Sequence, residues 1–138
     1  MKRTLIDAGP LIALFDKDDV YHDQIKGFLR EYKGRLITSW AVITEVLHML
    51  DFNIEAQIDF MKWIKRDALE IPNITKKDIT RIISLSKKYS DIPMDFADAT
   101  LIVISESKNI EEIISIDSDF YIYGNIRDKY IKNIFQNV

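Results

Sequence analysis

The stretch Arg3-Thr4-Leu5-Ile6-Asp7-Ala8-Gly9-Pro10-Leu11 decides the fold, because it contains a complete transition from a strand to a helix. The β-rich run from Arg3 to Ile6 stops at Asp7. Gly9-Pro10 marks a break, and proline is tolerated in the first turn of a helix. A short buried helix is therefore expected from Leu11 to Phe15, and a strand followed by a helix begins an alternating α/β chain.

The remainder of the chain repeats this alternation. Further strands are predicted over residues 35–38, 68–71, 113–116 and 131–135, the last of them an edge strand. Helices are predicted from residue 18 or 19 to 32, and over 40–50, 54–66, 75–89 and 94–107. Strands separated by helices form mostly parallel sheets that are covered on both faces. We therefore expect residues 1–138 to form a single α/β domain, a three-layer α/β/α sandwich with a mostly parallel sheet of four to five strands.

Several of these helices carry local signals of their own. The helix over residues 54–66 has one apolar stripe, made by Ile54, Ile58, Met61 and Ile64. Side chains that accept hydrogen bonds from free backbone N–H groups are expected at the helix starts. These expected caps are Asp18 or Asp19, Ser39, and Thr75, the last paired with Asp78 in a capping box.

Composition restricts the chemistry that this chain can perform. The absence of cysteine excludes disulfides, thiolate metal sites and a cysteine nucleophile. The two histidines, His22 and His48, are too few for a multi-histidine zinc site. The formal net charge of -3, from 19 basic and 22 acidic side chains, excludes a protein that binds nucleic acid by positive charge alone.

No targeting or membrane signal is recognisable in the sequence. Met1-Lys2-Arg3 is basic, but no apolar stretch of signal-peptide length follows it. The longest apolar run, from Ala99 to Ile104, is far shorter than the roughly 20 residues that span a bilayer. We therefore expect a cytoplasmic protein with no membrane partner.

Two of the predicted strands end directly in an aspartate. Asp7 follows the strand that ends at Ile6, and Asp117 follows the strand that ends at Ile116. Ligands bind beyond the carboxyl ends of the strands in an open parallel sheet, so the two carboxylates converge if these strands are neighbours. Aspartate is also common at strand ends because it forms turns, and this alternative stays open for each residue.

Asp98 is harder to explain as a surface residue. Its helical neighbours include Met94, Leu101 and Ile102, so it lies with the apolar face of its helix. A buried carboxylate is costly unless it is paired or bound to a cation; a salt-bridged core acid is the alternative. Asp95 lies three residues earlier and repels Asp98, a conflict that a nearby cation removes.

Glu45 and Asp119 are weaker candidates of the same kind. The helical neighbours of Glu45 are mostly apolar, and a salt bridge or a bond to His48 is the alternative to a metal-binding role. Asp119 follows Asp117 by two residues and fits a metal ligand, a helix cap or a solvated turn residue equally well.

Acidic side chains at one sheet edge, with no thiol and almost no histidine, favour a site for a hard cation. Mg²⁺ or Mn²⁺ suits such oxygen ligands better than Zn²⁺ or copper. Carboxylates this close cannot all remain ionised without a cation. A divalent ion held in this way binds phosphate oxygens and activates water, which indicates phosphoryl transfer or phosphodiester hydrolysis.

Four short motifs in this order resemble the PIN-domain ribonucleases, and in particular the VapC-like toxins of type II toxin–antitoxin systems. Each motif alone is common, but all four follow one another at the expected structural places and together cover essentially the whole chain. The motifs are Leu5-Ile6-Asp7-Ala8-Gly9-Pro10-Leu11-Ile12-Ala13-Leu14-Phe15-Asp16, Thr38-Ser39 with Val42 and Thr44-Glu45, Met94-Asp95-Phe96-Ala97-Asp98-Ala99, and Ser115-Ile116-Asp117-Ser118-Asp119-Phe120.

The resemblance implies an endoribonuclease that hydrolyses RNA phosphodiester bonds. It also implies a homodimer that a cognate antitoxin protein neutralises. The implied catalytic and metal-binding residues, around Mg²⁺ or Mn²⁺, are Asp7, Glu45, Asp98 and Asp117, with Asp95 and Asp119 as supporting acids and Ser115 orienting a water or a carboxylate.

Two other function classes remain as alternatives. The first is a metal-dependent phosphatase or phosphotransfer domain on a similar sheet. Haloacid-dehalogenase-type phosphatases need an aspartate where this chain has Gly9, and receiver domains need an acidic neighbour that Asp7 lacks. The second is a PIN-like binding module without activity, although all four acids are present.

Basic residues form two groups that either line a path for RNA or are solvated helix faces. Charge alone does not decide between these readings. The groups are Lys62, Lys65 and Arg66, and Lys76, Lys77, Arg81, Lys87 and Lys88.

Overall fold

The computed structural model describes residues 1–92, 94–116 and 131–135. Within this part of the chain it contains five strands and six helices. The strands are β1 (Arg3–Ile6), β2 (Arg35–Ile37), β3 (Leu69–Glu70), β4 (Glu112–Ile114) and β5 (Lys132–Asn133). The helices are α1 (Ala8–Phe15), α2 (His22–Glu31), α3 (Trp40–Met49), α4 (Ile54–Lys65), α5 (Lys76–Lys88) and α6 (Phe96–Lys108).

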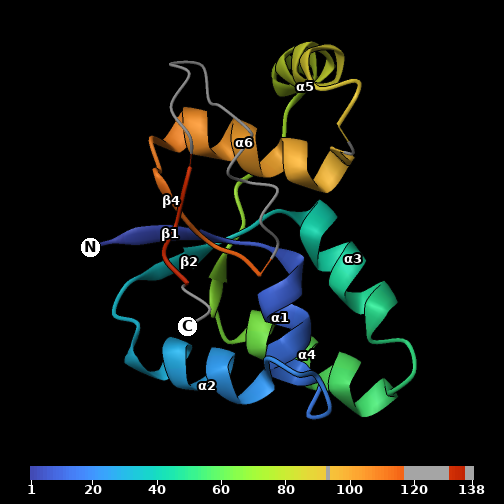
Figure 1. Ribbon diagram of the computed structural model, residues 1–138, viewed down its shortest axis with the longest axis vertical. Coiled ribbons are helices and arrows are strands. Elements are labelled where there is room, and N and C mark those ends of the chain that lie inside the picture. Colours follow the sequence, from blue (N-terminus) through green and yellow to red (C-terminus); the bar gives the residue numbers. More distant parts are fainter. Residues whose placement is uncertain (93, 117–130, 136–138) are drawn as a thin grey trace.

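The strands form one parallel sheet in the order β3-β2-β1-β4-β5 (Figure 1). After β1, the chain adds β2 and β3 on one side of this strand and then β4 and β5 on its other side. The strand order therefore reverses between β1 and β4, which pair at Leu5 with Ile113 and at Ile6 with Ile114. A reversal of this kind leaves a crevice beyond the strand ends in which ligands bind.

Helices cover both faces of the sheet, as a parallel sheet requires. In Figure 1, α6 and the α5 helix that crosses over it lie on one side, and α1, α2 and α4 lie on the other. Helix α3 contacts both α1 and α6, so it joins the two helical layers at the edge where β1 and β2 end. The expected α/β/α architecture with a mostly parallel sheet is confirmed.

The core lies where α6 packs on the sheet. In α6, Ala97 and every residue from Ala99 to Ser105 are buried, which accounts for the apolar run in the sequence. Leu5 and Ile6 of β1 are completely buried, on opposite faces of the sheet. Burial of such side chains contributes about 1.5–3 kcal/mol each for a residue of leucine size.

Every predicted strand is present, but four of the five are shorter than expected. The fourth strand ends at Ile114, so the prediction that this strand runs to Ile116 and ends directly in Asp117 is wrong. The physical reason is that a side chain takes over the pairing. Asn133 accepts a hydrogen bond from the Ser115 N–H (3.1 Å) and donates one to the Ser115 carbonyl oxygen (2.8 Å).

The start of α2 also differs from the prediction. The helix begins at His22, and neither Asp18 nor Asp19 caps it. Asp19 instead accepts a hydrogen bond from the Tyr21 N–H at 2.8 Å, a local turn that competes with helix formation. The other expected caps, Ser39 and the Thr75–Asp78 capping box, are confirmed.

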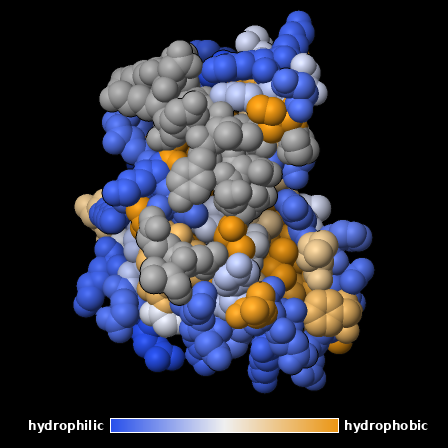
Figure 2. All heavy atoms as spheres, in the orientation of Figure 1, coloured by the Kyte–Doolittle hydropathy of each residue, from blue (hydrophilic) through white to orange (hydrophobic). Residues whose placement is uncertain are grey.

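The apolar stripe that predicts α4 is not the buried face of this helix. Ile54, Ile58 and Met61 are exposed by 63%, 39% and 45%, while Ala56 and Phe60 on another face are buried. Figure 2 shows apolar residues gathered on this side of the molecule, over α1 and the turn from α3 to α4. An exposed apolar stripe of this size is typical of a protein–protein contact.

The described helices include none with the length and apolar character that a bilayer crossing needs.

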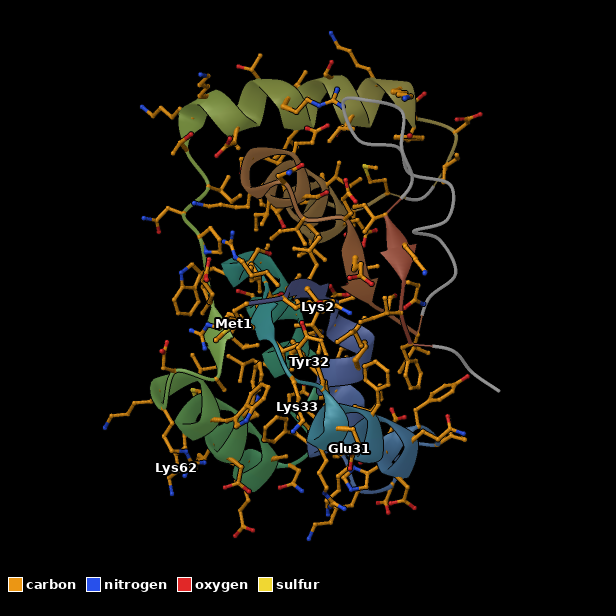
Figure 3. All side chains as sticks on the ribbon, turned by 90° about the vertical axis from the view of Figure 1, so that its left-hand side faces the viewer. Met1, Lys2, Glu31, Tyr32, Lys33 and Lys62 are labelled. Carbon is orange, nitrogen blue, oxygen red and sulfur yellow. The ribbon has the colours of Figure 1, made fainter. Side chains whose placement is uncertain are left out.

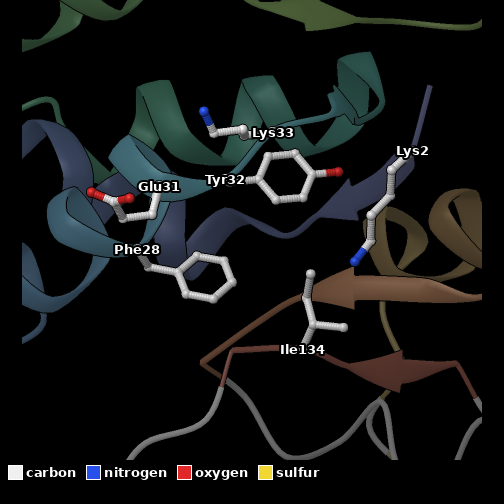
Figure 4. A pocket seen from close by; sticks show the side chains of 6 residues that line it. All are labelled: Lys2, Phe28, Glu31, Tyr32, Lys33 and Ile134. Atoms are coloured by element: carbon white, nitrogen blue, oxygen red, sulfur yellow. The ribbon is translucent and has the colours of Figure 1, made fainter.

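Gly34 lies at a close approach between α2 and β1. A Cβ atom here would lie 2.7 Å from the Lys2 carbonyl oxygen and would collide with the Tyr32 hydroxyl. That hydroxyl donates a 2.5 Å hydrogen bond to Thr4 and cannot move away without losing it (Figure 4). We expect Gly34→Ala to lower the free energy of unfolding by about 1–3 kcal/mol, as overpacking does, in urea denaturation.

Gly27→Ala is the matched control for this prediction. A Cβ atom at Gly27, inside α2, meets no atom within 4 Å. This substitution should raise the free energy of unfolding by about 0.5–1 kcal/mol, because glycine weakens a helix interior. Equal effects of the two substitutions would contradict the close approach at Gly34.

Candidate active site

Three helices begin at the edge of the sheet where β1 and β2 end. Asp7 directly follows β1 and is the N-cap of α1, where its carboxylate accepts a hydrogen bond from the Ala8 N–H at 2.8 Å. Ser39 caps α3 and Asp95 caps α6. Helix N-termini carry partial positive charge, so this edge of the sheet is suited to hold carboxylates.

Asp7 is buried, with only 8% of its surface exposed. The Ser115 hydroxyl donates a hydrogen bond to its second carboxylate oxygen at 3.2 Å. Ser115 is held in turn by the Asn133 side chain, whose amide oxygen also accepts a hydrogen bond from the Phe135 N–H. The Ser115 hydroxyl therefore contacts the Asp7 carboxylate, and its role as a supporting residue of the site stays a prediction.

Asp95 and Asp98 form a reciprocal capping box at the start of α6. The Asp98 N–H donates to the Asp95 carboxylate at 2.8 Å, and the Asp95 N–H donates to the Asp98 carboxylate at 3.3 Å. Each acid thus binds a backbone donor of the other, which holds the two repelling carboxylates near one another.

Burial and the charges around Asp98 raise the pKa of its carboxyl group from an ordinary value of 3.8 to about 8. Burial is the largest cause, followed by repulsion from Asp95 and then from Asp7. The two acids that repel Asp98 come from different parts of the fold: Asp7 directly follows β1, and Asp95 caps α6. A carboxyl group with this pKa gives up its proton readily only if a cation relieves the repulsion.

Glu45 joins the same group of charges from α3. Partial burial of its carboxyl group raises its pKa, and repulsion from Asp95 raises it further. The residue as a whole is exposed, so the expectation of mostly apolar surroundings is wrong. Of its helical neighbours, Val42 is buried, whereas His48 and Met49 are exposed as Glu45 is.

The remaining two acids of the expected site, Asp117 and Asp119, lie outside the described residues. Among residues 1–92, 94–116 and 131–135, no three acidic or histidine side chains are arranged to hold a metal ion by themselves. The donors that are described are all carboxylate oxygens under mutual repulsion. Their chemistry fits Mg²⁺ or Mn²⁺ and does not fit a softer metal.

A set of buried hydroxyl groups positions these elements, and sequence reasoning missed part of it. Thr38 donates a hydrogen bond to the Ile6 carbonyl oxygen at 2.9 Å and so links the ends of β2 and β1. The hydroxyls of Ser39 and Thr100 are hydrogen-bonded at 2.8 Å and link α3 to α6. Thr100 and Asn133 are not predicted; Thr100 is a polar residue inside an apolar run, a signal that could have identified it, whereas Asn133 follows Lys132 and gives no such signal.

A pocket of about 600 Å³ lies next to the end of α2, and none of the candidate acids lines it. Figure 4 shows Phe28 of α2 and Tyr32, the residue after this helix, on one of its sides and Ile134 on another. Large pockets are the default ligand sites of proteins, but the perturbed carboxyl groups are a more specific indicator of chemistry.

Two members of the second basic group have structural partners. Arg81 forms an ion pair with Glu106 of α6, with a nitrogen–oxygen distance of 2.9 Å, and Lys88 lies over the ring of Tyr89. In the first group, Lys62 extends outward from α4 (Figure 3). The role of the remaining lysines in RNA binding stays a prediction.

The family model of the PIN domain matches residues 4–126. The chain belongs to this family. Ribonuclease VapC26 of Mycobacterium tuberculosis is 22% identical to this PIN domain over 115 residues, which are 82% of this chain and 85% of that protein.

Two solved structures have a similar fold. One is VapC20 of Mycobacterium tuberculosis, a toxin that cleaves the sarcin-ricin loop, with a TM-score of 0.76 and 17% identity over 84% of this chain and 91% of that one. The other is a toxin–antitoxin complex from Klebsiella pneumoniae, with a TM-score of 0.65 and 19% identity over 86% of this chain and 90% of that one. The PIN domain thus resembles VapC toxins, as the four motifs predict.

The raised pKa of Asp98 predicts a pH dependence of stability. Between pH 3.8 and about 8 the folded chain keeps a proton that the unfolded chain has lost, so rising pH favours the unfolded state. Asp98→Asn keeps an acceptor oxygen for the Asp95 N–H and removes the titration. Without divalent metal, we expect the free energy of unfolding to fall more between pH 5 and pH 8 in the wild type than in this variant.

Asp59→Asn on the exposed face of α4 is the matched control for this prediction. Its free energy of unfolding should change with pH as that of the wild type does. The measurement is urea denaturation at both pH values. Parallel pH profiles for the wild type and Asp98→Asn would show that Asp98 is not perturbed in this way.

Proposed function

We propose that this PIN domain is a metal-dependent endoribonuclease that hydrolyses RNA phosphodiester bonds as the toxin of a toxin–antitoxin pair. The observation that carries the proposal is the electrostatic group of Asp7, Glu45, Asp95 and Asp98, which reach one sheet edge from three separate elements. Similarity to Ribonuclease VapC26 supports RNA as the substrate class.

Asp7, Glu45, Asp98 and Asp117 are the proposed ligands of Mg²⁺ or Mn²⁺, and Asp95 and Asp119 are proposed to support them. When bound, a divalent ion at carboxylates supplies a Lewis acid for phosphate oxygens and lowers the pKa of bound water.

The chain's own residues position these groups. Ser115 holds one carboxylate oxygen of Asp7, and the Ala8 N–H holds the other, so that carboxylate keeps a fixed orientation. Because its pKa is raised to about 8, Asp98 keeps a proton on its carboxyl group at neutral pH unless a bound cation lowers this pKa. The protonated form reduces repulsion among the carboxylates, and a divalent cation held by them would favour the ionised form.

Asp98→Asn tests this proposal directly. With purified protein, single-stranded RNA and Mg²⁺ or Mn²⁺, we expect cleavage that a chelator stops and that Asp98→Asn lowers by at least roughly 100-fold. The products are separated by denaturing gel electrophoresis, and circular dichroism checks that the variant remains folded.

The matched control, Asp59→Asn, removes the same charge from the exposed face of α4 and should cleave like the wild type. Full activity in Asp98→Asn would reject the site. Hydrolysis of phosphomonoesters without RNA cleavage would favour a phosphatase, and binding without cleavage of either substrate would favour a module without activity.

The proposed partners are a second copy of this chain and a cognate antitoxin protein, in the cytoplasm. The similarity to a toxin–antitoxin complex supports an antitoxin. The exposed apolar stripe of α4 offers surface for a protein contact.

Homodimer formation has a simple measurement. Light scattering coupled to gel filtration should give about twice the 16.2 kDa mass of one chain at micromolar concentration, because dimers of this kind bury apolar surface. A mass of 16.2 kDa across a tenfold range of concentration would contradict the proposed dimer.

A further inference from the structure

A pocket of about 260 Å³ is not used by the site described above, and its lining contains none of the candidate acids. It is enclosed by the starts of α3 and α6 and by the connection from β3 to α5. The N-terminal ends of α3 and α6 lie next to one another in Figure 1. We call it the aromatic pocket, and its lining includes Trp40, Pro72, Asn73, Ile74, Phe96 and Thr100.

The two aromatic residues of this pocket are largely exposed. Trp40 is 56% exposed and Phe96 is 53% exposed. Each is the first residue of its helix, directly after a cap that belongs to the candidate site: Ser39 before Trp40 and Asp95 before Phe96. Aromatic rings on both sides of one pocket, beside a set of carboxylates, are unexplained by packing within the chain.

Hydrogen bonds between buried hydroxyl groups fix the relative positions of the two helix starts that line the pocket. Thr100, in the pocket lining, is hydrogen-bonded to Ser39 at 2.8 Å and donates to the Ala97 carbonyl oxygen at 2.6 Å. The first bond joins the start of α3 directly to α6. The relative position of Trp40 and Phe96 is therefore set by buried groups, which pre-organises the pocket for a ligand.

The size and chemistry of the pocket select a small flat ligand. Its volume lies just below the roughly 300–1,000 Å³ of sites for drug-sized molecules, so it accommodates one ring system. Pro72 and Ile74 add apolar surface. The exposed Asn73 makes no side-chain hydrogen bond within the described residues, so its amide group can donate to and accept from a ligand edge.

We propose that the aromatic pocket binds one unpaired nucleobase of the RNA substrate, with Trp40 and Phe96 as stacking surfaces and Asn73 contacting the edge of the base. This inference rests on the proposed ribonuclease function and names the part of the chain that recognises sequence. Single-stranded RNA is recognised mainly by stacking of splayed bases on aromatic rings and by contacts to their edges. Phe96 directly follows Asp95 and lies two residues before Asp98, so the pocket and the acids share the first turn of α6 while facing different sides of it.

Binding can be measured without cleavage. Trp63 packs against Phe15 and Phe60 inside the fold, so Trp63→Phe leaves Trp40 as the single tryptophan reporter. In this background, with Asp98→Asn added and chelator present, a randomised single-stranded RNA hexamer should quench the fluorescence of Trp40 saturably. A hexamer of stable abasic ribose units should bind about tenfold more weakly, because it retains the phosphates and lacks the bases.

Phe96→Ala should weaken binding of the RNA hexamer about tenfold and leave binding of the abasic hexamer unchanged. Phe52→Ala removes an equally exposed aromatic ring from the turn between α3 and α4 and serves as the matched control. Equal binding of the two hexamers, or the absence of quenching by RNA, would overturn the proposal; a protein partner would then be the better occupant.

Cleavage provides the second measurement. With a randomised RNA library, Trp40→Ala, Phe96→Ala and Asn73→Ala should change the bases preferred around the cut and raise KM about tenfold more than they lower kcat. Trp40→Phe should restore most of the preference, since it restores a stacking surface. Unchanged cut sites and KM in all three alanine variants would overturn the proposal that the aromatic pocket binds a base, without affecting the proposed function. Failure of the wild type to cut any RNA would overturn the proposed function, and the binding measurement would then decide whether the pocket binds a base.

Discussion

Repulsion among carboxylates is the constraint on which the rest of the structure depends. Burial, together with repulsion from Asp95 and Asp7, raises the pKa of Asp98 to about 8, and ionising this carboxyl group therefore costs free energy in the folded chain. The fold offsets this cost with the positive ends of helices. Asp7 caps α1, and the other two acids cap α6 together, so each carboxylate accepts at least one backbone N–H.

A row of hydrogen bonds crosses the sheet at the same edge and fixes these caps in space. Thr38 links β2 to the end of β1, the Asp7 N–H binds the last carbonyl oxygen of β4, and Asn133 links Ser115 to β5. Ser39 and Thr100 link the two helices that begin there. Hydrogen bonds from other side chains and from the backbone thus hold the elements that carry the carboxylates, as a pre-organised site requires.

Much of this arrangement was predictable from the sequence, for reasons that differ between its parts. The strand that ends at Asp7 and the capping box of Thr75 with Asp78 were predictable because their signals are local. The hydrogen bonds between the Asn133 side chain and Ser115 could not be predicted, because they join residues 18 positions apart in the sequence. The exposed stripe of Ile54 and Ile58 was misleading for another reason: periodicity shows that a helix has an apolar face, and it does not show what covers that face.

The link from Asn133 through Ser115 to Asp7 also sets an order in time. A chain is made from its N-terminus and folds in part as it emerges, so β1 and Asp7 are available long before the residues that orient the Asp7 carboxylate. Ser115 lies 108 positions after Asp7 in the chain. The Asp7 carboxylate therefore acquires its final support only after Ser115 and Asn133 have both been synthesised.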